Sequence, residues 1–153
     1  MHLPAYLGLL ESAERALGAS FRAVGAGHAD EADIFHTCET LALQCDGHVA
    51  SLAPFLERYG RADAGDAGVA TDAGAVATVR SGPLGLLRDL HELFVVASRV
   101  EMTWTLIEQA AKGLRDAELL GAAAAALAQT EVQLAWLRTR LKVAAPQTLL
   151  VAS

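Results

Sequence analysis

The chain has no asparagine, only two isoleucines, and few aromatic residues, which make up 5% of its 153 residues. Residues that favour β-strands are therefore sparse apart from valine, and no segment sustains an alternation of polar and apolar residues. Apolar residues nevertheless make up 53% of the chain, and alanine, the strongest helix former, dominates them. The composition predicts a single all-α domain over residues 1–153, because this length suits one hydrophobic core.

Positive charge is also scarce. Twelve lysines and arginines face eighteen acidic residues, so the formal net charge is -6. Proteins that bind nucleic acids without regard to sequence need a stripe of lysine and arginine to displace counterions, which argues against a nucleic-acid partner. The most basic segment, residues 138–142, lies near the end of a predicted helix, where cations interact favourably with the helix dipole.

Long apolar runs are missing as well, and we expect no leader sequence. Glu11 and Glu14 interrupt the first apolar stretch, and the alanine-rich segment 119–128 is too short to span a bilayer. The two cysteines, Cys38 and Cys45, lie seven residues apart in a helical pattern, about 10 Å along one face. That distance is too long for a mutual disulfide. Reduced thiols suit the cytoplasm, so we expect a cytoplasmic protein with no membrane partner.

Apolar residues recur at three- and four-residue steps in four segments. They predict helices over about residues 4–24, 29–59, 84–112 and 116–143. Glycine or proline follows each segment and predicts its end, and Asp116 is a suitable N-cap for the last helix. These stop signals are Gly25-Ala26-Gly27, Gly60, Gly113 and Pro146.

The segment 61–83 is rich in glycine, alanine and aspartate and predicts a long linker between the second and third helices. The other two connections are short and therefore predict two antiparallel hairpins. A linker of this length can cross the whole bundle, which gives the ferritin-like arrangement of two hairpins joined by a long crossover. An up-down-up-down bundle with a loose loop is the alternative.

Three segments resemble an uncharacterised bacterial family of ferritin-like four-helix-bundle proteins. The resemblance is carried by His48 with Arg58-Tyr59-Gly60, by the helix that contains Trp104, and by residues 136–147. It covers most of the chain except the linker. It implies a ferritin-like fold and no particular activity.

Ferritin-like di-iron centres take a glutamate from two helices and a Glu-x-x-His pair from each of the other two. Each predicted helix here offers a carboxylate near mid-height, and the second helix adds an imidazole. The candidate metal ligands are Glu14, His36, Glu39, Glu101 and Glu131, for iron or another divalent metal. Both Glu-x-x-His pairs are broken, however, because Ala42 follows Glu39 and Leu134 follows Glu131 at the required spacing. The sequence therefore predicts a degenerate or partial site.

Plain structural roles compete with these assignments. Glu14 lies inside an apolar stripe, where it would pair with a buried arginine or histidine. His48 and Trp104 are interpreted as packing residues, and His28 as a local cap at the start of the second helix. The run Ala122–Ala126 permits close approach of another helix, either within the bundle or across a dimer.

The sequence leaves three functions open. The first is a non-catalytic ferritin-like bundle with a degenerate metal site, assembled as a homodimer through its helical faces. The second is an atypical metal-binding oxidoreductase or metal-storage protein that uses iron or manganese. The third is a small-ligand binder that uses space left by small side chains.

Overall fold

The computed structural model describes residues 1–62, 76 and 78–151. Its helices are α1 (Leu3–Gly27), α2 (Ala32–Tyr59), α3 (Gly82–Leu114) and α4 (Ala117–Pro146), followed by a π-helical turn, η2 (Gln147–Val151). No strand occurs in the described part of the chain. The predicted all-α, four-helix fold is confirmed. In the described residues, no helix is long and apolar enough to cross a membrane.

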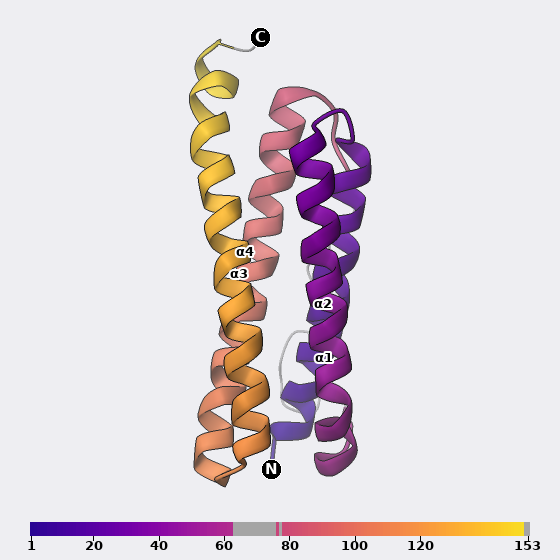
Figure 1. Ribbon diagram of the computed structural model, residues 1–153, viewed down its shortest axis with the longest axis vertical. Helices are drawn as coiled ribbons and strands as arrows, with labels where there is room; N and C mark the ends of the chain where they lie inside the picture. The colour runs from indigo at the N-terminus through magenta and orange to yellow at the C-terminus, as the bar shows by residue number, and fades with distance from the viewer. Residues whose placement is uncertain (63–75, 77, 152–153) are drawn as a thin grey trace.

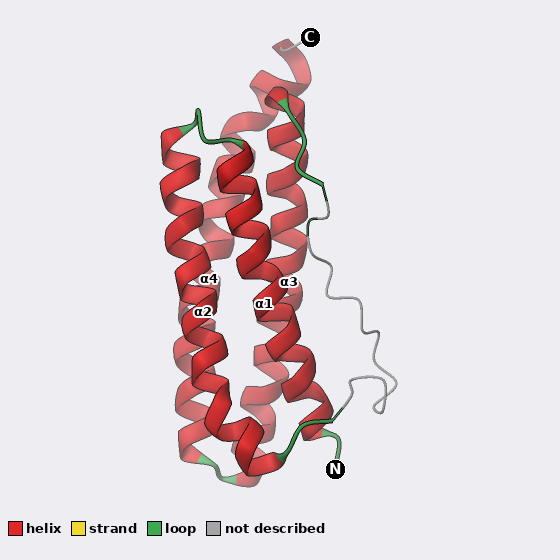
Figure 2. Ribbon diagram, turned by 90° about the vertical axis from the view of Figure 1, so that its right-hand side faces the viewer, coloured by secondary structure: helices red, strands yellow, loops and turns green. Residues whose placement is uncertain are grey.

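The helices lie side by side along one axis (Figure 1). α1 packs closely on α2, α3 packs closely on α4, and α1 also packs on α3, whereas α2 and α4 are the neighbouring helices that touch least. His28 after α1 contacts Asp89 at the start of α3, and Arg58 at the end of α2 contacts Asp116 before α4. α2 therefore ends, and α3 begins, at opposite ends of the bundle (Figure 2).

Most of the predicted linker 61–83 lies outside the described residues. Its later part lies against α1, where the Val76 N–H donates to Ser20 Oγ at 2.9 Å. Val76 is buried, and a Cβ placed on Gly27 would meet the Val79 side chain. The end of this connection is thus anchored on the bundle before α3 begins.

Three predicted helix ends are wrong. α1 continues through Gly25 to Gly27, because Gly25 is a buried contact residue inside the helix. α3 continues past Gly113, and Arg115 at φ 56° supplies the left-handed cap after Leu114. α4 continues past Val143 to Pro146 and then widens into the π turn. Proline has no N–H and clashes with the preceding turn, so the hydrogen-bond ladder must change there.

Two glycines of α1 set its close approach to α2. Gly18 lies opposite Cys45 and Gly25 lies opposite Cys38, so that a Cβ on either glycine would fall 3.2 Å or 2.9 Å from the cysteine Cβ. The two contacts lie seven residues apart on both helices, because both helices have the same rise per residue, and their order is reversed because the pairing is antiparallel. Both cysteines are buried and free. They serve as small packing residues in this contact.

Replacing Gly25 with alanine is expected to lower the free energy of unfolding by about 1–3 kcal/mol, because the added methyl must push two helices apart. Gly121→Ala is the matched control. Gly121 lies within α4, and nothing lies within 4 Å of the position that an added methyl would take, so this change should stabilise by about 0.5–1 kcal/mol. Urea titrations of the two variants measure both effects. A stabilised Gly25→Ala variant would contradict the close contact.

Candidate functional site: a buried polar layer

One carboxylate lies in the middle of the apolar core. Glu14 comes from the inner face of α1 and is fully buried, between leucines one turn away on either side. Its Oε1 accepts hydrogen bonds from His48 Nδ1 at 3.0 Å and from Trp104 Nε1 at 2.8 Å. These donors come from α2 and α3, so a single oxygen atom joins three helices.

His48 extends the layer to the fourth helix. Its Nε2 lies 2.7 Å from Gln129 Oε1 on α4. Both partners of the ring are then acceptors, which requires a proton on each ring nitrogen. Burial alone lowers the pKa of His48, but the hydrogen bond and charge of Glu14, with the bond to Gln129, raise it above its ordinary value. The raised pKa and the two acceptors both favour the protonated form of this ring inside the bundle.

Two acceptor atoms of this layer have no N–H or O–H donor among the described residues. They are Glu14 Oε2 and Gln133 Oε1, both buried. The amide of Gln133 instead donates to Gln44 Oε1 at 3.0 Å. The thiol of Cys45 interacts with both Glu14 and Gln133. Burial, followed by the charge of Glu14, raises the pKa of this thiol, so it stays protonated and acts at most as a weak donor.

A groove between α2 and α4 leads to His48. It has a volume of about 560 Å³ and small or polar walls that include Gly47, Ala122, Ala125 and Ala126. His48 and Gln129 both line it. α2 and α4 are the least closely packed neighbouring helices. The small side chains of the alanine run leave the space between them open as a groove.

The five predicted metal ligands do not form one site. Glu14 is buried, while His36, Glu39 and Glu131 are exposed and Glu101 is half-buried. The histidine beside Glu14 is His48, three turns along α2 from His36. In the described part of the chain, no three histidine, cysteine, aspartate or glutamate side chains lie close enough to hold a metal ion. A ferritin-like di-iron centre needs several carboxylates around one point, and the residues present do not fit it.

A second polar cluster, at one end of the bundle, was not predicted from the sequence. Asp89 is fully buried and accepts from His28 Nε2 at 2.8 Å, from the Arg80 N–H at 3.0 Å and from Arg80 Nη1 at 2.9 Å. Arg80 Nη2 also donates to Glu92 at 2.6 Å. The predicted local capping role of His28 is wrong, because its ring contacts a residue 61 positions away. The position of Asp89 between Leu86 and Leu93 in the stripe was the available signal.

No family model, curated protein or solved structure matches this chain.

Proposed function

We propose that this chain is a non-catalytic helical bundle of ferritin-like layout, in which a hydrogen-bonded polar layer occupies the level of a degenerate metal site. One observation carries the proposal: the only fully buried candidate ligand, Glu14, is already bonded through Oε1 to His48 and Trp104. A carboxylate oxygen that holds two N–H donors is satisfied without a cation. The two close antiparallel pairs, α1 with α2 and α3 with α4, support the ferritin-like layout.

The contacts of this polar layer favour a structural role over a catalytic one. Both nitrogens of His48 are occupied, and its Nε2 is covered by Gln129. A general base needs a free nitrogen within reach of a substrate proton. Buried polar networks of this kind can specify one packing arrangement of helices.

Assembly as a homodimer is part of the same proposal. The α2/α4 groove offers small side chains over which another helix can pack, with Leu43 on its wall 63% exposed. A second copy would bury this leucine and close the groove above His48.

A second candidate, an atypical metal-binding oxidoreductase or metal-storage protein, is favoured by the two unsatisfied oxygens, Glu14 Oε2 and Gln133 Oε1. Carboxylate and amide oxygens suit hard divalent cations such as manganese. Reaching the usual coordination number would require further ligands, and the exposed glutamates of α2 and α4 do not supply them.

Metal analysis of protein purified without chelator separates the two candidates. We expect iron, manganese and zinc well below one ion per chain, both before and after incubation with each metal, and an unchanged melting temperature. Sedimentation of the same sample should give twice the 16.0 kDa chain mass. Stoichiometric metal that is lost in Glu14→Gln but retained in Glu131→Gln would overturn the non-catalytic proposal in favour of metal binding. A monomer would overturn the dimer alone.

A further inference from the structure

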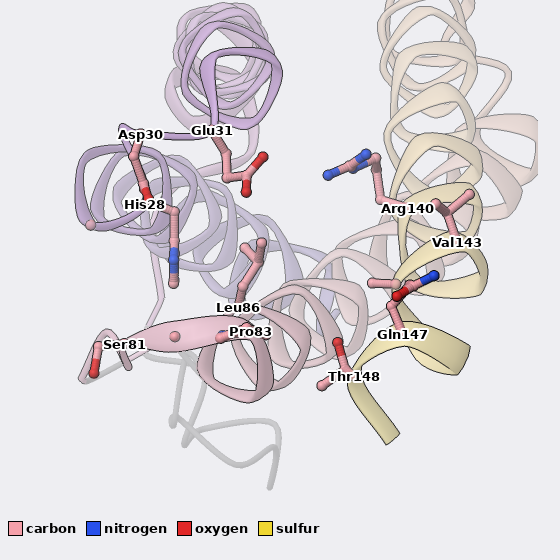
Figure 3. A pocket seen from close by; sticks show the side chains of 13 residues that line it. His28, Asp30, Glu31, Ser81, Pro83, Leu86, Arg140, Val143, Gln147 and Thr148 are labelled. Carbon is pink, nitrogen blue, oxygen red and sulfur yellow. The ribbon is translucent and has the colours of Figure 1, made fainter. Parts of the chain in front are cut away.

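A cavity of about 550 Å³ lies at the end of the bundle, far from the buried layer (Figure 3). Its walls come from the end of α1 and the turn before α2, from the start of α3, and from the end of α4 with the π turn. The volume lies in the range of small-molecule sites. Apolar side chains form part of its surface, among them Pro83, Leu86 and Val143. The cavity can therefore bury an aliphatic group.

Opposite charges project into this cavity from facing walls. The Glu31 carboxylate and the Arg140 guanidinium point toward one another across it (Figure 3). Arg140 Nη1 contacts Asp33 at 3.3 Å, while its Nε is buried with no hydrogen-bond partner in the described part of the chain. Arginine binds carboxylates through two parallel N–H donors. A carboxylate in the cavity that approaches the guanidinium on the side away from Asp33 leaves the contact with Asp33 in place.

The charges on the walls select the ligand class. Asp30 and Glu31 line the cavity, and Asp33 lies beside Arg140. A simple anion would be repelled by these carboxylates, whereas an ammonium group would be attracted to them. A molecule that carries one ammonium and one carboxylate matches Glu31 and Arg140 together and adds no net charge.

The π turn contributes two polar residues to the wall. Pro146 ends the regular α4 ladder, and the wider turn that follows places Gln147 and Thr148 on the cavity. Thr148 is buried although its neighbours Leu149 and Leu150 are exposed. Single π turns in helices often occur at functional sites, because they redirect side chains.

The geometry points to a binding site for a small zwitterion of the α-amino acid class, with an aliphatic side chain. The carboxylate binds Arg140, the ammonium binds Glu31, and the side chain lies on Leu86 and Val143. This site is independent of the buried layer and of the proposed non-catalytic role of that layer.

Titration calorimetry with L-leucine tests the site, with 4-methylpentanoate and isoamylamine as probes that each lack one charge. We expect leucine to bind with a Kd of about 1 mM or tighter, and each of the other two probes to bind at least about tenfold more weakly. Arg140→Gln and Glu31→Gln should each weaken leucine binding by about tenfold or more, since each removes one charge-assisted bond.

Two further variants exclude effects of misfolding. Arg138→Gln changes an arginine of α4 that lies over Phe94 and not on the cavity, and it should bind leucine as the unchanged chain does. Arg140→Lys keeps the charge beside Asp33 without the two-pronged donor, and it should bind more weakly with an unchanged melting temperature. No leucine binding at about 10 mM, equal binding of all three probes, or binding unaffected by Arg140→Gln would each overturn the proposal.

Discussion

Replacing Glu14 with alanine is expected to lower the free energy of unfolding by about 3–5 kcal/mol. The change removes the common acceptor of His48 and Trp104, leaving His48 Nδ1 and a buried indole N–H without an acceptor. Urea denaturation followed by circular dichroism measures the loss. Glu131→Ala on α4 is the control, because that side chain is exposed, and it should change stability by less than about 0.5 kcal/mol.

A double variant separates the interaction between Glu14 and His48 from the cost of burying the two side chains. Glu14→Leu with His48→Leu removes both charges, and it should be more stable than either single variant, since apolar replacement of a whole buried pair is often neutral. If the effects of the two single changes simply add, the two side chains do not interact, and the layer is not held by this pair.

The pH dependence has a definite sign. The pKa of His48 is raised in the folded chain above its ordinary value of 6.5. The stabilisation from this pair is therefore complete below pH 6.5 and is lost as the pH rises through the folded pKa. The stability difference between the unchanged chain and Glu14→Gln should shrink over that window. A difference that grows with rising pH would contradict a charged His48.

Replacing Asp89 with alanine is the second large effect, with an expected loss of about 3 kcal/mol. Three donors lose their common acceptor, including the buried ring of His28. The loss falls at the low end of the range for broken buried pairs, because Arg80 is 27% exposed and keeps Glu92. Hydrogen exchange should rise at the Arg80 amide and in the first turns of α3.

Glu92→Ala is the matched control for Asp89→Ala. Glu92 contacts the same arginine, but its side chain is 44% exposed. Exposed ion pairs contribute about 0–1 kcal/mol. Equal losses from the two changes would show that the arginine contact, and not the buried carboxylate, anchors the start of α3.

The sequence is most informative where side chains repeat along a helix. The stripes of leucine and alanine predict four helices, and the place of Glu14 within a stripe predicts that it needs a partner. Periodicity does not reveal which residue from another helix meets it, so the sequence assigns His48 to packing and favours His36 as a ligand. Glu39 and Glu131 lie at the border of an apolar stripe. Whether such a residue is buried or exposed depends on how α2 or α4 is rotated about its axis, and the sequence does not give this rotation.

Other features depend on contacts between distant residues. Asp89 and Gln133 each occupy stripe positions and could have been marked as buried polar residues. Their partners could not. His28 reaches Asp89 because α1 packs on α3, and Arg80 reaches it through the path of the chain between α2 and α3. The π turn also escaped prediction, since proline after a helix more often ends it.

The facing glycines of α1 and cysteines of α2 are compatible with two alignments of α1 along α2. Gly18 and Gly25 repeat at the same interval as Cys38 and Cys45, so α1 could slide by two turns and still set a glycine against a cysteine. Small residues alone would tolerate both alignments. Only one of them brings Glu14 level with His48 and Trp104. The contact between Glu14 and His48 thus selects one of the two alignments of α1 on α2. A chain with apolar residues in place of Glu14 and His48 could populate both alignments.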